Sequence, residues 1–395
     1  TSTDISVMPN NVFQETRTGK IGGQDIGTPM IDIRTLGAGG GTVAWLGPDG
    51  LLKAGPHSAG ADPGPACYGR GGQEPTVTDA DLLLGYLGPG GLIGGRVQLS
   101  RELGEQAIRE RIAGPLSLTV QEAALGISRV VNVNIEVGLR LSLMERGLDL
   151  RQFALVAFGG AGPVHAAQVA RDLGIPRVIV PPNPGISCAM GLLQTDVKHY
   201  YLQSRLAALT GVAVEELDAA YERLEERALA EAREEGFDAA SAKLLRQMDL
   251  RYPYQGYELT VPCPSGAWTE AGKAGIRRAF DELHQEVYGI SAPEEVPDVV
   301  NLRVVSVSPV PRLDLPLIQA KGRAEDALIG RRDVLFQETG GYVLTPVYRR
   351  DGLPPGSEIE GPAIVEQLDS TTVILARQRA AVDDRGTLII TVEAV

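Results

Sequence analysis

The stretch ALVAFGGAGPVHAAQVARDLGIPRVIVPP, residues 154–182, indicates the fold class of this chain more clearly than any other. Its two apolar runs, 154–158 and 177–182, have the length and composition of buried strands, and the segment between them has helical periodicity. Pro163 falls at the first helical position, where a missing N–H leaves no helical hydrogen bond unmade. A strand, a helix and a second strand in this order form a crossover connection. The sequence therefore predicts parallel strands and an α/β fold.

The turn of this unit, GGAG at residues 159–162, is a candidate binding site. Glycines let the backbone approach a ligand closely, and the N-terminus of the following helix presents unpaired N–H groups to an anion or a ribose phosphate. A tight crossover turn that needs small residues is the structural alternative, because a glycine-rich turn alone is a weak signal. We interpret His165, in the first turn of the helix, as a packed or capping histidine.

A second glycine-rich stretch lies upstream. Residues 31–55, IDIRTLGAGGGTVAWLGPDGLLKAG, predict three strands with antiparallel pairing, and Pro-Asp-Gly at 48–50 has the chemistry of a hairpin turn. The run GAGGG at 37–41 would weaken a hairpin, which indicates that another group presses against its backbone. A nucleotide phosphate and a closely packed helix are both candidates for that group.

The loop that follows, GPHSAGADPGPACYGRGG at residues 55–72, is too long and irregular for a simple turn. Such a loop is typical of a binding segment laid over a rigid scaffold. His57 and Asp62 are its candidate contacts to a metal or a substrate. A Ser-His-Asp triad with Ser58 is disfavoured, because the three residues lie so close in sequence and lack the context of a nucleophile elbow.

The rest of the chain divides into further predicted elements and domains. A T-x-x-E capping box at Thr119 and Glu122 begins a long buried helix that ends near Gly147. An amphipathic helix over 214–236, a strand pair and a second helix form an α+β region, and short strands separated by Gly, Pro and Asp turns end the chain. The predicted domains are residues 1–205, an α+β extension at 206–312, a linker at 313–332 and a small all-β domain at 333–395.

Composition and charge narrow the function classes. The 395 residues carry a net charge of −13 without a basic cluster interleaved with aromatics, so nucleic acid is not an expected partner. No apolar run approaches the roughly 20 residues that span a bilayer, so we expect a soluble, cytoplasmic protein without membrane contact. The cysteines lie far apart and indicate neither disulfides nor a zinc site. Each is expected to be a small buried side chain: Cys67, Cys188 and Cys263.

Six motifs, in order along the chain, carry a family resemblance. They are TSTDIS at 1–6, DIRTLGAGGGTVAWL at 32–46, GPHSAGADPGPACYGRGG at 55–72, EPTVTDADLLLG at 74–85, LVAFGGAGPVHA at 155–166 and GPAIVEQLDSTTVIL at 361–375. With these motifs the chain closely resembles the hydantoinase A / 5-oxoprolinase family, which includes the β subunits of acetone and acetophenone carboxylases. The resemblance implies the second half of an actin-like, ribonuclease-H-like ATPase, followed by a small all-β C-terminal domain, with nucleotide bound between two related halves.

The resemblance also implies a role for the first residues of the chain. TSTDIS is similar to the end of a phosphate-binding loop of the form Asp-x-Gly-Gly-Thr-x-x-Asp, and Thr1 and Asp4 match its last positions. The chain therefore resembles the C-terminal piece of a longer enzyme, whose missing N-terminal actin-like half would come from the same gene product or from a separate chain. A trimmed fragment, a split gene and cleavage before Thr1 are three origins that fit.

The chemistry of the family implies roles for particular residues. ATP would phosphorylate an amide or enolate oxygen of a small molecule (a hydantoin, oxoproline, another lactam or a ketone), while backbone N–H groups and Mg²⁺ (or Mn²⁺) meet the phosphoryl charge. Asp4 is the implied metal ligand and, with Thr1, His57 and Asp62, a candidate catalytic residue. The implied nucleotide contacts are Thr1, Ser2, Thr3, Gly39, Gly40, Gly41, Gly159, Gly160, Gly162 and Pro163. Among them, Thr1 and Thr3 are the implied phosphate donors, and Gly159, Gly160 and Gly162 are the implied seat of the adenosine.

Two other functions stay open at the level of the sequence. A free amine at Thr1 beside its own hydroxyl is the arrangement of N-terminal-threonine hydrolases, although the rest of the sequence favours an ATPase half. A non-catalytic scaffold subunit would keep the shape and hydrolyse nothing without partners. In the ATPase interpretation, the expected partners are the other actin-like half and a hydantoinase B-type subunit that handles part of the substrate.

Overall fold

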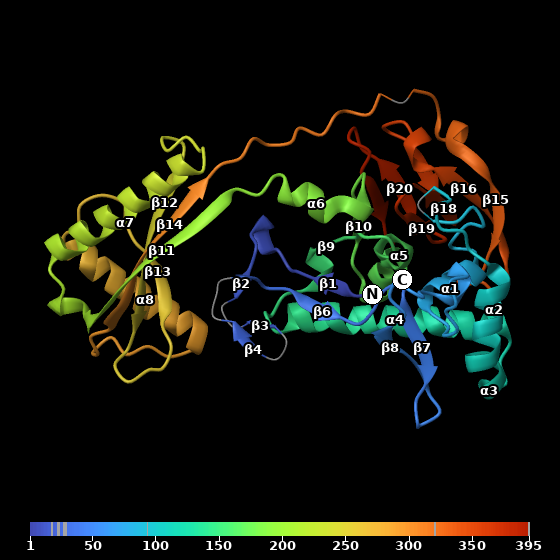
Figure 1. The fold of residues 1–395 in the computed structure, drawn as a ribbon, viewed down its shortest axis with the longest axis horizontal. Helices are drawn as coiled ribbons and strands as arrows, with labels where there is room; N and C mark the ends of the chain where they lie inside the picture. Colours follow the sequence, from blue (N-terminus) through green and yellow to red (C-terminus); the bar gives the residue numbers. More distant parts are fainter. Residues whose placement is uncertain (17–18, 22–23, 27–29, 93, 320, 394–395) are drawn as a thin grey trace. The chain divides into compact units, whose positions relative to one another are not determined.

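The structure is a computed structural model that describes residues 1–395 except 17–18, 22–23, 27–29, 93, 320 and 394–395 (Figure 1). The chain forms two compact units. The main unit comprises Thr1–Cys188 and Leu315–Val395, and the insert unit comprises Ala189–Asp314. Each unit has its own hydrophobic core.

The predicted crossover lies within the main unit. Strand β9 (Ala154–Val156) leads into helix α5 (Gly162–Leu173) and then into β10 (Arg177–Val180). The two strands pair in parallel, with Ala154 opposite Arg177. The α/β class predicted from the sequence is therefore confirmed.

Helix α4 (Val120–Met144) begins at the predicted capping box. The Glu122 carboxylate accepts a hydrogen bond from the Thr119 backbone N–H at 2.8 Å, and the Thr119 hydroxyl accepts one from the Glu122 N–H at 3.2 Å. Gly147 has φ +65° just after the helix, in agreement with the predicted end. One face of α4 packs against α1 (Val77–Leu84) and α5, which joins the N-terminal region to the crossover.

The first strand of the chain finds its partner without any local signal in the sequence. β1 (Thr3–Ile5) runs antiparallel to β6 (Arg34–Leu36). The predicted hairpin is present as β7 (Thr42–Leu46) and β8 (Leu52–Ser58). The expectation that three consecutive strands of this region pair with one another is wrong, because β6 takes β1 as its partner in place of β7.

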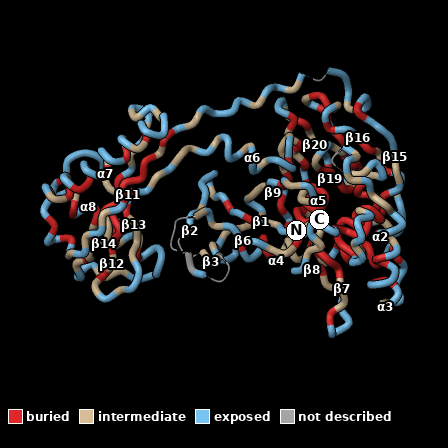
Figure 2. The backbone as a smooth tube through the Cα atoms, in the orientation of Figure 1, coloured by how far each residue is buried: buried red, intermediate tan, exposed pale blue. Residues whose placement is uncertain are grey.

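The C-terminal strands complete the main unit. The sequence predicts a separate all-β domain at 333–395 after a linker at 313–332. In the structure, β15 (Leu328–Val334) begins inside that linker, and β21 (Leu388–Thr391) pairs with β10 in the sheet of order β17-β20-β21-β10-β9. Buried side chains of β17 to β21 belong to the same hydrophobic cluster as those of α5 and β10, and Figure 2 colours much of this region as buried.

The other strands and α-helices of the main unit are short. They are β2 (Glu15–Thr16), β3 (Gly19–Ile21), β4 (Gln24–Ile26), β5 (Met30–Ile31), α2 (Arg101–Ile108), α3 (Gly114–Leu116), β16 (Val343–Arg349), β17 (Glu358–Glu360), β18 (Ala363–Glu366), β19 (Thr371–Ile374) and β20 (Arg379–Val382). A second sheet has the strand order β15-β16-β18-β19. Helix α6 (Ser187–Leu192) begins in the main unit and ends in the insert unit.

The insert unit is an antiparallel sheet with two helices. The two helices and one strand pair were predicted from the sequence, whereas the two long strands at 197–208 and 298–308 were not. Its strands in spatial order are β11 (Val197–Ala208), β14 (Asp298–Ser308), β12 (Lys243–Arg251) and β13 (Leu259–Pro262). The helices α7 (Val214–Glu234) and α8 (Glu270–Tyr288) contribute apolar side chains to the core that they share with the sheet.

The cysteines differ in burial. Cys67 is buried as expected, and burial raises the pKa of its thiol. Cys263 is half-buried, whereas Cys188 is exposed in the short helix α6, so the expectation of burial is wrong for Cys188. Among the described residues, no helix combines the length and the apolar character needed to cross a bilayer.

Candidate functional site

The loops that follow β9 and β10 meet at one edge of the sheet, because the carboxyl ends of parallel strands lie together. β9 is followed by the glycine turn, residues 159–162, and β10 by a proline-containing loop, residues 181–187. The Gly159 N–H donates a hydrogen bond to the Pro184 carbonyl at 2.7 Å, which ties the two loops together. Both loops line an open groove of about 2730 Å³ in the main unit.

The glycine turn has room for a ligand. A Cβ atom placed on Gly159 or Gly162 would meet nothing within 4 Å, and one on Gly160 would lie 3.7 Å from the Asp369 carbonyl oxygen. Gly159 has φ +83°, a conformation that favours glycine. Helix α5 starts after Ala161 without a capping side chain, so its first N–H groups are left for other acceptors. The turn can therefore present N–H donors to an anion.

The N-terminal segment, residues 1–4, lines the same groove. The Thr3 hydroxyl donates to the Ala38 carbonyl at 2.6 Å, and the Thr35 hydroxyl donates to Asp4 Oδ1 at 2.6 Å. These bonds fix the segment on the strand that leads into the glycine run, residues 37–41. Asp4 is exposed, and its carboxylate is the group of this segment that could hold Mg²⁺.

The glycine run packs closely against the rest of the main unit. A Cβ atom on Gly39 would lie 2.9 Å from the Thr1 nitrogen, and one on Gly40 would lie 2.8 Å from Thr78 Oγ1. The Thr78 N–H also donates to the Gly40 carbonyl at 2.8 Å. Helix α1 is thus the closely packed helix that the sequence allowed as one explanation of the run. The predicted nucleotide contacts of the run line the groove as well, and their role stays a prediction.

Three predicted site residues lie outside the groove. His57 is exposed on β8, Asp62 is exposed in the loop that follows it, and Pro163 is buried in the first turn of α5. In the part of the chain that the structure describes, no group of three or more His, Cys, Asp or Glu side chains could hold a metal ion. A metal ion at Asp4 would therefore need ligands from the nucleotide, water or another chain.

A buried pair of titratable side chains also lines the groove. His165 Nε2 lies 3.5 Å from Asp81 Oδ2, and the side chains are 4% and 3% exposed. Among the described residues, neither His165 Nε2 nor Asp81 Oδ1 has a hydrogen-bond partner. His165 is packed, as interpreted from the sequence. Asp81 was missed because the aspartates of its helix, VTDADLLL, predict exposed side chains, whereas both are buried.

Sequence reasoning also missed the C-terminal loop, residues 367–370, between β18 and β19. The Ser370 hydroxyl lies 3.2 Å from each of the first two carbonyl oxygens of the glycine turn. Asp369 Oδ2 accepts a hydrogen bond from the Gly185 N–H at 2.8 Å. The C-terminal loop is therefore bonded to both loops that follow the parallel strands. The polar stretch QLDS between two apolar strands was the available signal.

A buried arginine supports the C-terminal loop. Arg350 donates to Gln367 Oε1 at 3.0 Å and to the carbonyl oxygens of Val180 and Gly386 at 2.7 Å each. Gln367 Nε2 in turn donates to Asp369 Oδ1 at 2.8 Å. Burial lowers the pKa of Arg350 to about 10, against the effect of nearby carboxylates, so the guanidinium stays protonated at neutral pH. It holds the end of β10 and the C-terminal loop in one arrangement.

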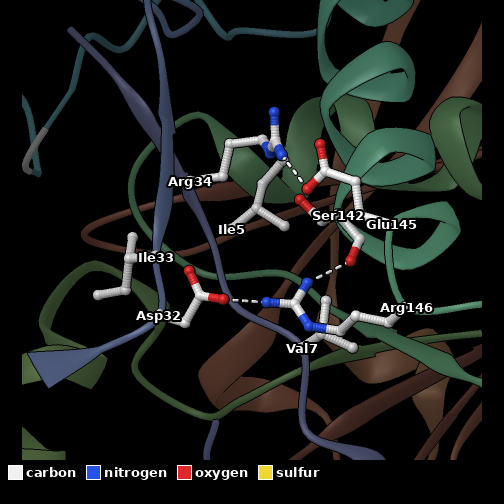
Figure 3. Close-up of a pocket in the computed structure, with 8 residues that line it drawn as sticks. All are labelled: Ile5, Val7, Asp32, Ile33, Arg34, Ser142, Glu145 and Arg146. Atoms are coloured by element: carbon white, nitrogen blue, oxygen red, sulfur yellow. Dashed lines mark hydrogen bonds and ion pairs between the residues drawn. The ribbon is translucent and has the colours of Figure 1, made fainter. Parts of the chain in front are cut away.

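A second, smaller pocket of about 230 Å³ lies beside β1 (Figure 3). It carries two ion pairs, Arg34 with Glu145 at 2.5 Å and Arg146 with Asp32. Both pairs join the region of β5 and β6 to the end of α4. Since these charged side chains are already paired, the pocket serves as an anchor for β6, and hence for β1, rather than as a binding site. Its lining residues are Ile5, Val7, Asp32, Ile33, Arg34, Ser142, Glu145 and Arg146.

The main unit is thus an α/β protein with a glycine turn, an uncapped helix N-terminus and a groove at the ends of its parallel strands, the place where α/β sheets commonly bind ligands. Residues 1–201 match the family model described as hydantoinase/oxoprolinase, and residues 207–392 match that of the hydantoinase/oxoprolinase C-terminal domain. The chain belongs to the hydantoinase/oxoprolinase family, which confirms the resemblance found in the sequence.

Several characterised proteins are similar to this chain. Caprolactamase subunit alpha of Pseudomonas jessenii is 36% identical over 93% of this chain and 53% of its own length. The acetophenone carboxylase gamma subunit of Aromatoleum aromaticum is 34% identical over 99% of this chain and 55% of its own length. The chain thus spans about half the length of the curated relatives it matches.

Two solved structures share the fold over 99% of this chain and 57% of theirs. Nucleotide-free acetone carboxylase has a TM-score of 0.85 at 27% identity. The ATP-dependent caprolactamase of Pseudomonas jessenii has a TM-score of 0.81 at 34% identity. Both neighbours use ATP: the first carries out ATP-dependent acetone carboxylation, and the second is an ATP-dependent caprolactamase.

Proposed function

We propose that this chain supplies one wall of the ATP site in an ATP-dependent enzyme of the hydantoinase/oxoprolinase type, as the second half of an actin-like, ribonuclease-H-like ATPase. The observation that carries the proposal is the open glycine turn. Its glycines face space instead of protein atoms, beside the uncapped start of α5 and in the groove that the N-terminal segment also lines. The ATP dependence of the two similar structures supports a nucleotide as the ligand.

The groove offers donors and a carboxylate that suit nucleotide phosphates. Thr1 and Ser2 bring hydroxyl and backbone N–H groups, and the glycine turn brings further N–H groups. Thr3, whose hydroxyl donates to the Ala38 carbonyl, holds this segment in place. Asp4 would hold Mg²⁺ (or Mn²⁺), since an exposed carboxylate is a ligand that hard cations prefer. Such an ion, when bound, neutralises part of the phosphate charge. The hydrogen bond from Thr35 keeps the Asp4 carboxylate in one orientation.

The proposed reaction is phosphoryl transfer to an amide or enolate oxygen of a small molecule. Phosphorylation turns that oxygen into a leaving group, and preorganised donors at the groove stabilise the charge that spreads over the phosphoryl oxygens. A cyclic amide and a ketone both offer such an oxygen, in keeping with the names caprolactamase and acetone carboxylase of the relatives. Because relatives are named as subunits, we propose the other actin-like half and a hydantoinase B-type subunit as partners.

Calorimetric titration with ATP tests the proposal. One wall of a site offers few contacts, and binding must overcome several kcal/mol of lost freedom, so the chain alone should show no micromolar affinity. The completed enzyme, meaning this chain assembled with the other half and the B-type subunit, should bind ATP tightly and hydrolyse it. Micromolar binding by the chain alone would contradict the proposal. Binding without hydrolysis by the completed enzyme would favour a scaffold subunit instead.

A further inference from the structure

The C-terminal loop touches the glycine turn at its backbone carbonyl oxygens. The Ser370 side chain is buried, and its hydroxyl lies 3.2 Å from the carbonyl oxygens of Gly159 and of Gly160. A hydroxyl has a single proton, so the two oxygens share one donor. The contact joins residues about 210 positions apart in the chain and is therefore a feature of the tertiary structure.

Because the peptide bond is planar, this contact also determines the direction of two backbone N–H groups. In a trans peptide, the carbonyl of one residue and the N–H of the next point in opposite directions. The carbonyl of Gly159 belongs to the same peptide plane as the N–H of Gly160, and the carbonyl of Gly160 to the plane of the Ala161 N–H. Since both carbonyls are drawn toward Ser370, both N–H groups point away from it.

These two N–H groups have no acceptor in the described part of the chain. The preceding N–H, that of Gly159, is taken by the Pro184 carbonyl, and the N–H of Val164 is taken by the Ala161 carbonyl. Gly160 and Ala161 both line the groove, directly before the uncapped start of α5. Adjacent backbone N–H groups at a helix N-terminus form a concave donor pair that suits an anionic oxygen.

We propose that Ser370 is a positioning residue that orients the Gly160 and Ala161 N–H groups toward a phosphate oxygen of the bound nucleotide. The inference rests on the proposed function, and it assigns a phosphate oxygen to the turn where the family resemblance implies the adenosine. Ser370 does not touch the nucleotide. It fixes the two carbonyls, and without it the peptide planes of a glycine turn rotate easily, because glycine has few steric limits.

The strand that follows Ser370, β19, supplies a matched control. Thr372 is buried, and its Oγ1 has no hydrogen-bond partner among the described residues. Ser370→Ala and Thr372→Val each remove one buried hydroxyl from the same part of the main unit. Only the first removes a contact to the glycine turn. An effect of removing a buried hydroxyl as such would therefore appear in both variants, whereas a loss of positioning would appear only in Ser370→Ala, and thermal unfolding reports any loss of stability separately.

The test is titration of the completed enzyme with ATP, ADP and adenosine, with thermal unfolding of each variant alongside. Ser370→Ala should weaken the affinity for ATP and ADP about tenfold, since one hydrogen bond of ordinary strength is lost from the positioning of the turn. The affinity for adenosine should stay within about twofold, because adenosine carries no phosphate. Thr372→Val should bind all three ligands like the wild type.

Each other outcome has a definite meaning. Wild-type affinity for ATP in Ser370→Ala would overturn the inference, and so would an equal loss of affinity for ATP and adenosine. A similar loss in Thr372→Val would also overturn it, because the effect would then be one of general stability. If the wild-type completed enzyme binds no ATP, the proposed function itself fails, which is a separate result from a variant that binds normally.

Discussion

The glycine run at 37–41 and the glycine turn at 159–162 look alike in the sequence and differ in the space around them. A Cβ atom on Gly37 would lie 2.7 Å from the Pro56 Cα, which is closer than such atoms approach. A Cβ atom on Gly162 would meet nothing within 4 Å. Residues of both stretches line the groove, but the protein's own atoms fill the space where a side chain of the run would lie, whereas that space is open beside the turn.

The comparison separates two reasons for glycine in a binding-site motif. In the run, close contact with neighbouring backbone requires glycine for folding, and no ligand is needed to explain it. In the turn, only Gly159 has a conformational reason, its φ of +83°. The remaining glycines of the turn have no such reason within the protein, which is what we expect if a ligand approaches the backbone there. The turn is thus the part of the site where the nucleotide interpretation has its strongest support.

The largest effect on stability is expected for a control substitution in the insert unit, which contains neither glycine stretch. Asp249 is fully buried and accepts hydrogen bonds from Arg303 at 2.7 Å, Thr260 at 2.6 Å and Asn301 at 3.0 Å. Asp249→Asn leaves the buried Arg303 charge unpaired and should destabilise the insert unit by about 3–5 kcal/mol. Denaturant unfolding measures this loss. The ATP affinity of the completed enzyme should not change. A parallel loss of ATP affinity would contradict the assignment of the ATP site to the main unit.

The same residue predicts the acid sensitivity of the insert unit. Burial raises the pKa of Asp249, but the hydrogen bonds from Arg303, Thr260 and Asn301 outweigh it and hold the pKa below 3.8. A carboxyl with a lowered folded-state pKa contributes stability that is present above the unfolded pKa and is lost as pH falls through the folded pKa. The unfolding free energy should therefore fall below about pH 4. The unfolding free energy should fall less steeply with pH in Asp249→Asn than in the wild type. Equal slopes in the two proteins would refute the assignment of this acid sensitivity to Asp249.

The next effect concerns the N-terminal segment, which lines the groove together with the turn. Asp4→Asn in the completed enzyme should lower kcat about 100-fold, or about 2.7 kcal/mol, with little change in ATP affinity, because the carboxylate matters most as phosphoryl charge develops. Thr1→Ala is the control for an N-terminal-threonine hydrolase. Steady-state kinetics distinguish the two. If Thr1→Ala eliminates a hydrolysis that needs no ATP while Asp4→Asn is mild, the ATPase interpretation is wrong.

A smaller effect is expected in the glycine run. Gly37→Ala places a methyl group against Pro56 and should lower the unfolding free energy of the main unit by about 1–3 kcal/mol, the usual range for an overpacked site. Differential scanning calorimetry should show a lower Tm for the main unit and an unchanged one for the insert unit. An unchanged Tm for both units would remove the packing explanation of the run.

The smallest effect is the same substitution in the glycine turn. Gly162→Ala adds a methyl group where nothing lies within 4 Å, at the start of α5. Alanine restricts the unfolded chain and favours a helix, so the unfolding free energy should rise by about 0.4–1 kcal/mol. Gly37→Ala and Gly162→Ala should thus change stability in opposite directions. A loss of stability in Gly162→Ala would show that the turn is packed like the run.

Local signals in the sequence predicted the local parts of this fold. Apolar strand runs, Pro163 at the helix start and the Thr119–Glu122 capping box fixed β9, α5, β10 and α4, because each depends on residues a few positions apart. The pairing of β1 with β6 and of β21 with β10 depends on residues far apart in the chain. Short strands without a strong pattern do not specify such partners.

In the candidate site, too, the sequence identified residues that have a local pattern and missed residues that depend on distant contacts. The N-terminal segment, the glycine run and the glycine turn were each singled out by their residue types, and the structure brings all three to one groove. His57 and Asp62 were singled out for the same kind of reason and lie outside it. Ser370 and Asp81 were missed, because their importance comes from distant neighbours, the glycine turn and His165, that no local pattern identifies.

The central claim is that the glycine turn binds nucleotide, and the most direct test is ATP turnover by Gly160→Val in the completed enzyme. A branched side chain on Gly160 projects into the groove and blocks the approach of a ligand to the backbone, while the nearest protein atom is the Asp369 carbonyl oxygen at 3.7 Å. We predict that ATP turnover falls at least 100-fold, about 2.7 kcal/mol, with a Tm close to that of the wild type. Turnover at the wild-type rate would show that the turn is only structural and would contradict the claim.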